Sequence, residues 1–198
     1  MPKPKSAPKN MPLLSDKLQR LQKDDLLLAN VYAEDVTDAA VAAAATLTSQ
    51  GLSGVYVSLS KDYLSISVQL EVAGADVSRL KFIDAASRVY GIAPVESEEV
   101  TYIDGPLAIE PILGAVASSL WGLKGRRFVI LDSLTAILLY NTPEKTLAFG
   151  DRLAALLKKE GVAGVIVLAY QDSINEELVH KLEVSGGEAV IVKGRRTG

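Results

Sequence analysis

The stretch RRFVILDSLTAILL, residues 126–139, contains four consecutive apolar residues that end at Asp132. An apolar run without alternating polar residues is typical of a parallel β-strand that helices cover on both faces. The run therefore predicts a central strand with Asp132 and Ser133 at its carboxyl end. Ligands of such sheets bind in the crevice beside the carboxyl ends of the strands, so this aspartate is a candidate site residue.

Apolar runs alternate with helical patterns on both sides of this strand. Thr142 and Pro143 supply an N-cap and a first-turn proline for one helix, and Gly161 supplies its end. Strands are predicted at residues 26–33, 53–60, 80–84, 100–104, 126–132, 164–170 and 188–193, and helices at residues 37–51, 63–73, 106–123, 143–160 and 176–182. The alternation predicts an α/β fold with three α/β/α layers and a mostly parallel central sheet.

The amino-terminal residues differ in composition from the rest of the chain. Residues 1–12 combine proline and lysine with few residues to bury, which predicts a flexible basic tail. A cap at Ser15 or Asp16 and leucines at helical spacing predict a short amphipathic helix that packs on the sheet edge. These leucines are Leu13, Leu14, Leu18 and Leu21. Residues 13–198 fit a single domain.

The overall composition excludes several classes of protein. Apolar residues make up 48% and charged residues 23% of the 198 residues, as in a folded globular protein. The chain has no cysteine and a single histidine, His180, which excludes disulfides, thiolate sites and an ordinary zinc site. It contains no run of about 18 apolar residues and no leader-like segment, so we expect a cytoplasmic protein without a membrane partner.

Several segments together resemble the KaiC branch of the RecA superfamily. RRFVILDSLTAILL is similar to the Walker B strand of that family, and DKLQRLQKDDLLLA, residues 16–29, to its entry helix and first strand. LKFIDAASRVYG, residues 80–91, is similar to the segment before Walker B, and KLEVSGGEAVIV, residues 181–192, to the closing elements. The resemblance implies a RecA-like fold, with Asp132 as the Walker B aspartate that holds magnesium and Gln171 as a sensor of the terminal phosphate.

The segment after the first strand departs from the family pattern. A working phosphate loop has the sequence Gly-x-x-x-x-Gly-Lys-Ser/Thr, because glycines let backbone amides surround the phosphates and the lysine neutralises them. This chain has VYAEDVTDAA at residues 31–40, without any glycine. Gly51 and YVSLS, residues 56–60, are similar to the family's second strand, and counting back from them puts Val36 at the lysine position and Thr37 at the hydroxyl position. Only Thr37 and Asp132 remain from the phosphate and magnesium ligands.

Three carboxylates, Glu34, Asp35 and Asp38, surround the amino end of the helix that follows. Two like charges about 4 Å apart repel by about 4 kcal/mol at an effective dielectric constant of about 20, so these carboxylates oppose a triphosphate. They are instead expected to complement the helix dipole and to cap its free amides. The loop therefore predicts an anion site that is satisfied internally.

Two other positions bear on catalysis. KaiC-like enzymes have a water-activating glutamate after the second strand, where this chain has Ser60 and Lys61, and neither is an ordinary carboxylate base. Asp132 is expected to serve the structure by bonding backbone amides or the hydroxyls of Ser133 or Thr135. Gln171 is then expected to make an ordinary hydrogen bond at the end of its strand.

These features favour a catalytically inactive pseudo-ATPase without a cofactor, acting as a regulatory or scaffolding protein through a protein partner or self-association. One alternative is an ATPase with a displaced lysine, Lys61, which would need ATP and magnesium. Another is an accessory protein of the recombinase-paralogue kind, which binds DNA phosphates through basic residues near both ends. Those residues are Lys3, Lys5, Lys9, Lys193, Arg195 and Arg196. The net charge of −3 and the 6% of aromatic residues weigh against DNA binding.

Overall fold

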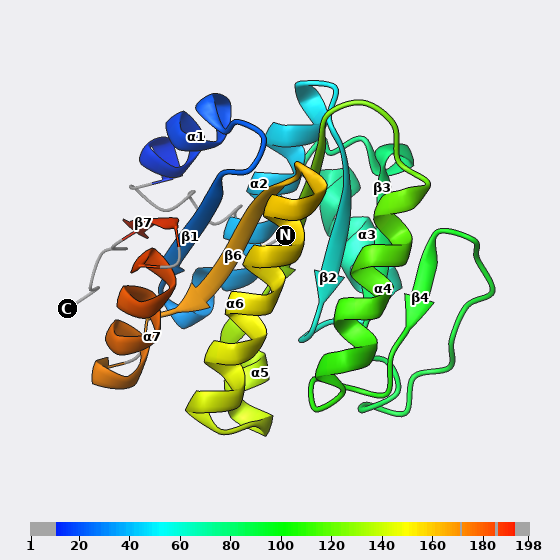
Figure 1. The fold of residues 1–198 in the computed structure, drawn as a ribbon. Coiled ribbons are helices and arrows are strands. Elements are labelled where there is room, and N and C mark those ends of the chain that lie inside the picture. Colours follow the sequence, from blue (N-terminus) through cyan, green and yellow to red (C-terminus); the bar gives the residue numbers. More distant parts are fainter. Residues whose placement is uncertain (1–10, 171, 185, 193–198) are drawn as a thin grey trace, which may run out of the picture.

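One parallel sheet with helices on both faces forms the core of the molecule (Figure 1). The computed structural model describes residues 11–170, 172–184 and 186–192. The strands are β1 (Leu26–Val31), β2 (Ser53–Ser58), β3 (Leu80–Asp84), β4 (Val100–Tyr102), β5 (Arg127–Asp132), β6 (Ala163–Ala169) and β7 (Gly187–Val192). The helices are α1 (Met11–Arg20), α2 (Val36–Ser49), α3 (Tyr63–Val72), α4 (Ile109–Trp121), α5 (Leu134–Tyr140), α6 (Pro143–Glu160) and α7 (Asp172–Val184), with short 3-10 turns at Ala33–Asp35 and Val77–Arg79.

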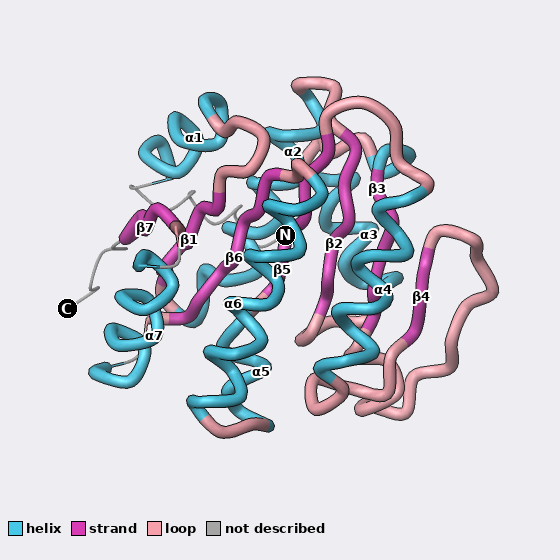
Figure 2. The backbone as a smooth tube through the Cα atoms, viewed as in Figure 1, coloured by secondary structure: helices cyan, strands magenta, loops and turns pink. Residues whose placement is uncertain are grey.

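The strand order is β4-β3-β2-β5-β6-β1-β7, and the pairings between these strands are all parallel (Figure 2). β5 lies in the middle of the sheet, as its apolar run predicts. Asp132, at its carboxyl end, is in register with Ser58 of β2 and Val167 of β6. The predicted α/β class with three layers is therefore confirmed, and β6 separates β1 from β5.

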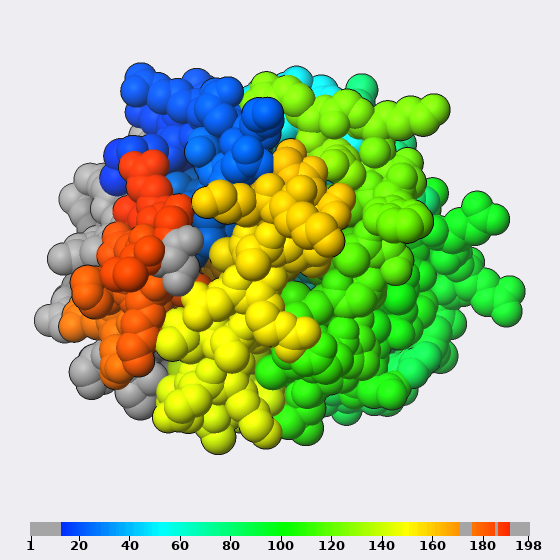
Figure 3. Space-filling model, in the orientation of Figure 1, coloured from blue at the N-terminus to red at the C-terminus, as the bar shows by residue number. Residues whose placement is uncertain are grey.

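The two faces of the sheet build two separate hydrophobic cores. Helices α1, α2 and α3 cover one core, which contains Tyr56, Phe128 and Ile130. Helices α4, α5, α6 and α7 cover the other, which contains Val129 and Leu131. Neighbouring residues of β5 thus enter opposite cores, which explains why its sequence does not alternate. Side chains of α4, α6 and α7 form much of the surface over the second core (Figure 3).

The ends of α6 follow the sequence signals. The Thr142 hydroxyl accepts a hydrogen bond from the Lys145 amide at 3.3 Å, and Pro143 occupies the first turn. Gly161 ends the helix with φ 65°, a left-handed conformation that glycine adopts without a steric penalty. Both predicted boundaries of this helix are confirmed.

The amino-terminal helix differs from its prediction in its start. α1 begins at Met11, so Ser15 and Asp16 lie inside the helix and do not cap it. Leu14 and two later leucines are buried, whereas Leu13 is 48% exposed. The helix packs on α2 and on β7, the edge strand, as expected. No helix in the described ranges has the length and apolarity needed to cross a membrane.

Several further element boundaries differ from the sequence predictions. α4 begins at Ile109, because residue Gly105 has φ 136° and the Pro106 carbonyl accepts a hydrogen bond from Asn141 at 3.2 Å, outside the helix. α7 extends beyond the predicted residues 176–182 at both ends, and β4 is limited to three residues. The short helix α5, directly after β5, was not predicted.

Gly54 of β2 is required by close packing. It is paired with Phe128 of β5, and a Cβ at this position would overlap three carbons of the fully buried Phe128 ring. We expect Gly54→Ala to lower the free energy of unfolding, measured by urea unfolding, by about 1–3 kcal/mol, the usual cost of overpacking.

Gly114→Ala is the matched control, because Gly114 lies in α4 with open space around it. That change should raise stability by about 0.5–1 kcal/mol. Equal effects of the two substitutions would contradict this packing account.

Candidate functional site

The candidate site lies at the carboxyl ends of β2 and β5. From β2 the chain passes through α3, on the first core, to β3, whereas from β5 it passes through α5 and α6, on the second core, to β6. Adjacent strands whose connections leave in opposite directions form a switch point, where open α/β sheets bind their ligands. Asp132 and the segment after Ser58 meet there.

Asp132 is fully buried, and one side chain among the described residues donates a hydrogen bond to its carboxylate. The Tyr56 hydroxyl donates a hydrogen bond of 2.8 Å to Oδ2, while Oδ1 has no hydrogen-bond partner among the described residues. Burial raises the pKa of Asp132 to about 6, although the Tyr56 hydrogen bond and the positive charge of Lys61 act in the opposite direction. The aspartate is therefore an incompletely satisfied acid at the switch point.

The structural partners expected for Asp132 are wrong. The Thr135 hydroxyl accepts a hydrogen bond from the Ala169 amide at 2.8 Å, which ties the start of α5 to the end of β6. Ser133 precedes α5 without a capping hydrogen bond from its side chain. Neither hydroxyl is found to bond the carboxylate, because each lies after the strand has ended and the chain has turned toward the second core.

Tyr56, which sequence reasoning missed, is the partner instead. It lies in the middle of β2, is fully buried, and faces the same core as Asp132. Burial, followed by the charge of Asp132, raises the pKa of the Tyr56 hydroxyl well above its usual value. A tyrosine within a run as apolar as GVYV is a usable signal, since a buried phenol needs a hydrogen-bond partner.

Lys61 lies on the loop that follows β2. Its carbonyl accepts a hydrogen bond of 2.6 Å from the Ser58 hydroxyl, and its side chain is half-buried. Its positive charge acts to lower the pKa of Asp132. Lys61 therefore provides a cation where the resemblance would place a catalytic glutamate.

The segment between β1 and α2 is short. After β1 ends at Val31, a single 3-10 turn over Ala33–Asp35 leads directly into α2 at Val36, which is buried. Thr37 is half-buried, and Asp35, at the N-cap position of α2, forms no side-chain cap hydrogen bond, so the capping expected of the three carboxylates is not found at this residue.

Glu34, within this turn, and Asp38, in the first turn of α2, are exposed at the amino end of the helix, where they can still interact with its dipole. Two aromatic rings lie beside the same turn. The rings of Tyr32 and Tyr170 meet edge to face, with their centroids 6.1 Å apart, and the Tyr170 amide donates a hydrogen bond to the Val31 carbonyl. The ends of β1 and β6 are thus joined by backbone and by ring contacts, beside the position where the resemblance places a phosphate loop.

Asp84, at the end of β3, is a second buried carboxylate that the sequence did not single out. Its oxygens accept hydrogen bonds from the amides of Tyr63 (2.7 Å), Ala86 (2.9 Å) and Ser87 (2.8 Å), and from the Ser87 hydroxyl (2.6 Å). These bonds tie β3 to the amino end of α3 and to the following turn. In contrast to Asp132, this carboxylate has its bonding capacity fully used.

Several predicted residues lie outside the described residues. These are Gln171 and the basic residues Lys3, Lys5, Lys9, Lys193, Arg195 and Arg196. In the described part of the chain, no group of three or more acidic or histidine side chains is arranged to hold a metal ion.

Comparisons with known proteins agree with this architecture. The chain superimposes on an uncharacterised protein from Pyrococcus horikoshii, crystallised with an unknown peptide, with a TM-score of 0.66, 17% identity, and coverage of 89% of this chain and 82% of the other. It also superimposes on a KaiC-like protein from the same archaeon, with a TM-score of 0.62, 12% identity, and coverage of 89% and 74%. These likenesses show a RecA/KaiC-like fold. No curated protein matches the sequence, and residues 55–193 match DUF7090, a family of unknown function.

Proposed function

Because the chain belongs to DUF7090, a family of unknown function, its role has to follow from its own residues, and we propose a catalytically inactive RecA/KaiC-like domain that acts through protein association. The observation that carries this proposal is the segment between β1 and α2. It has neither glycine nor lysine, it turns directly into the helix, and it carries carboxylates at the amino end of α2, where the resemblance would have a phosphate bind. We infer that it is a degenerate phosphate loop.

The surroundings of Asp132 support the same proposal. The carboxylate is fully buried and accepts a hydrogen bond from Tyr56, and the charge of Lys61 acts to lower its pKa. Magnesium usually keeps several of its waters and binds through carboxylates and substrate phosphates. We infer that an aspartate at the position that the resemblance assigns to Walker B, buried and bonded to Tyr56 as Asp132 is, leaves little room for such a hydrated ion.

Exposed apolar side chains at the carboxyl end of the sheet support association. Leu107 is 65% exposed and Leu139 is 74% exposed. Asn141 joins their segments, because its side-chain amide donates hydrogen bonds to the carbonyls of Pro106 and Ile137 at 3.2 and 3.1 Å. Tyr140, which follows Leu139 in the chain, is also exposed. Contiguous apolar groups on a surface mark interaction sites more often than isolated ones do.

The structural neighbour with a bound peptide fits this picture. The uncharacterised Pyrococcus horikoshii protein, which shares the fold, was crystallised in complex with an unknown peptide. We propose that a peptide segment of a partner is also the ligand class of this chain, received at the carboxyl end of the sheet. The apolar residues Leu107, Leu139 and Tyr140 would then supply the contact area.

Site-specific photo-crosslinking tests the proposed surface. A photoreactive amino acid at residue 107 or 140 is expected to give a discrete adduct in extracts of the native host, because both positions lie on the proposed surface. The matched control is residue 121, where Trp121 is 85% exposed at the other end of α4. Adducts of equal yield from all three positions, or from residue 121 alone, would rule out a specific surface at the carboxyl end.

One alternative function has a specific observation in its favour. Lys61 lies on the loop that follows β2, next to β5 in the sheet, and its charge acts to lower the pKa of Asp132, as would suit an ATPase with a displaced lysine. In that case ATP binding would be lost on Lys61→Ala. If the domain is inactive as proposed, neither the parent chain nor Lys61→Ala binds nucleotide, and the two give the same result.

A further inference from the structure

A groove between α4 and α6 adjoins the proposed association surface. Leu107, one of the exposed residues of that surface, is also a lining residue of the groove. The volume of the groove is about 390 Å³, within the range of sites that bind small ligands. The association surface therefore includes a hollow that can receive a side chain of a partner.

Apolar residues form most of the lining. They come from α6 and from the segment that leads into α4, and they are Leu107, Ala108, Ile109, Pro111, Ala148 and Phe149. Phe149 is buried at 1% exposure, whereas Leu107 is exposed. A hollow with a buried aromatic ring and an exposed apolar residue suits an apolar anchor of a bound peptide, since such anchors fill desolvated pockets.

The groove is held together by contacts between its two walls. The Asn141 side chain, just before α6, donates a hydrogen bond of 3.2 Å to the Pro106 carbonyl, just before α4. Farther along α6, the Arg152 guanidinium donates a hydrogen bond to each carboxylate oxygen of Glu110. These two links fix α6 against the start of α4, so the groove does not need a ligand to form.

The charged residues of the lining leave one positive charge in excess. The hydrogen bonds from Arg152 hold the pKa of Glu110 below its usual value, so this carboxylate is ionised and is neutralised by Arg152. Lys145 is exposed and forms no ion pair with any described residue. The groove thus offers a cation that a carboxylate of a ligand can pair with.

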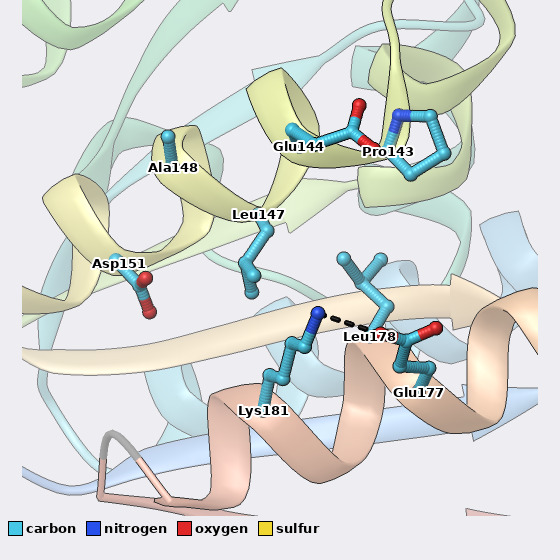
Figure 4. A pocket seen from close by; sticks show the side chains of 8 residues that line it. All are labelled: Pro143, Glu144, Leu147, Ala148, Asp151, Glu177, Leu178 and Lys181. Carbon is cyan, nitrogen blue, oxygen red and sulfur yellow. Dashed lines mark ion pairs between the residues drawn. The ribbon is translucent and has the colours of Figure 1, made fainter.

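The other side of α6 differs in charge. A second groove there, against α7, is lined by Glu144 and Glu177, and its base, Lys181, already pairs with Glu177 at 2.6 Å (Figure 4). A hydrogen bond within its own residue, followed by one with Thr142, holds the pKa of Glu144 below its usual value, so this residue is ionised. An acidic ligand is therefore favoured on the α4 side of α6 and disfavoured on the α7 side.

We propose that the groove between α4 and α6 selects the peptide partner by taking an apolar side chain, while Lys145 pairs with an adjacent aspartate or glutamate of the peptide. This inference rests on the proposed association and adds the chemistry of the partner, an acidic and apolar segment. The amino ends of α4 and α6, at Ile109 and Pro143, carry partial positive charge beside the groove and favour the same sign of ligand.

Methyl NMR titration of the full chain with defined tetrapeptides tests this selection. The probe is an acetylated and amidated peptide of alternating leucine and glutamate, and its glutamine and lysine counterparts differ from it only in charge. The glutamate peptide is expected to shift the methyl resonances of Leu107 and Ile109 and to bind about two- to fivefold more tightly than the glutamine peptide at low salt, as an exposed ion pair gives. This difference should disappear at about 1 M salt.

Substitutions of Lys145 assign the preference to this groove. Lys145→Gln should give equal affinities for the glutamate and glutamine peptides, whereas Lys145→Arg should retain the difference. Lys158→Gln is the matched control and should change nothing, because Lys158 is an exposed base in the last turn of α6. Equal affinities in the parent chain, a preference that survives Lys145→Gln, or tighter binding of the lysine peptide would each overturn the inference. So would methyl shifts confined to Leu147 and Leu178, which line the groove on the α7 side.

Failure of this selection can be told apart from failure of the proposed association. Crosslinks from residues 107 and 140 without any charge preference among the peptides would overturn the selection and leave the association intact. A charge preference that depends on Lys145, without crosslinks from either position, would count against the association and support the groove as a site for acidic peptides.

Discussion

Asp84→Ala is expected to lower the free energy of unfolding by about 3–5 kcal/mol. Asp84 is 1% exposed and accepts four hydrogen bonds, three of them from backbone amides. Alanine would leave these buried donors without an acceptor, and each unsatisfied buried donor costs about 1–3 kcal/mol. Since a domain of this size is stable by only about 5–15 kcal/mol, the variant should lose a large part of its stability in urea unfolding.

Two milder substitutions separate this explanation from a general sensitivity of the region. Ser87→Ala removes one of the four hydrogen bonds and should cost about 1 kcal/mol. Asp62 is the N-cap of α3, the helix that Asp84 also contacts, and its carboxylate accepts one hydrogen bond of 2.9 Å from the Ser65 amide. Asp62→Ala removes this cap and should also cost about 1 kcal/mol. If Asp84→Ala costs no more than Asp62→Ala, the hydrogen bonds of the Asp84 carboxylate do not stabilise the fold as proposed. Should Asp84→Ala fail to fold, Asp84→Asn, which retains one acceptor oxygen, is expected to give an intermediate loss.

Asp132→Asn is expected to gain about 2 kcal/mol of stability relative to the parent chain as the pH rises from 4.5 to 8. The pKa of Asp132 is about 6 in the folded chain because of burial, whereas an unfolded aspartate has a pKa of about 3.9. The folded state therefore binds the proton more tightly than the unfolded state. The stability from this proton is fully present below about pH 4 and is lost as the pH rises through about 6, whereas asparagine has no such dependence.

The relevant measurement is urea unfolding of both chains at pH 4.5 and pH 8. Other titrating groups are common to the two chains, so their contributions cancel in the difference. Tyr56→Phe gives an independent check, because it removes the hydrogen bond that favours the ionised carboxylate. Its cost should be larger at pH 8 than at pH 4.5. Parallel pH dependences of the parent and Asp132→Asn chains would show that burial does not raise the pKa of Asp132.

The sequence predicted the central part of the fold because its signals are local. The apolar run of β5 and the Thr142 and Gly161 boundaries of α6 each depend on neighbouring residues alone. The start of α4 was misplaced because a tertiary contact, from Asn141 to the Pro106 carbonyl, holds those residues outside the helix. The apolar residues after Asp132 did not reveal whether the chain turns, and α5 was missed for that reason.

The candidate site was predicted in position but not in its contacts. The end of the β5 run located Asp132 at the carboxyl edge of the sheet. Its partner, Tyr56, is 76 residues earlier in the chain, and the two meet only because β2 and β5 are adjacent in the sheet. The same reason hid Asp84, whose partner Tyr63 belongs to the helix after another strand. Strand order, which local patterns do not specify, decides both contacts.

The most direct test of the proposed inactivity is a calorimetric titration of the chain with ATP in the presence of magnesium. The replaced segment between β1 and α2, its carboxylates and the buried Asp132 predict no saturable heat. Tight binding of one ATP per chain that is lost in Asp132→Asn would contradict the account, because it would show that this aspartate still serves a working nucleotide site.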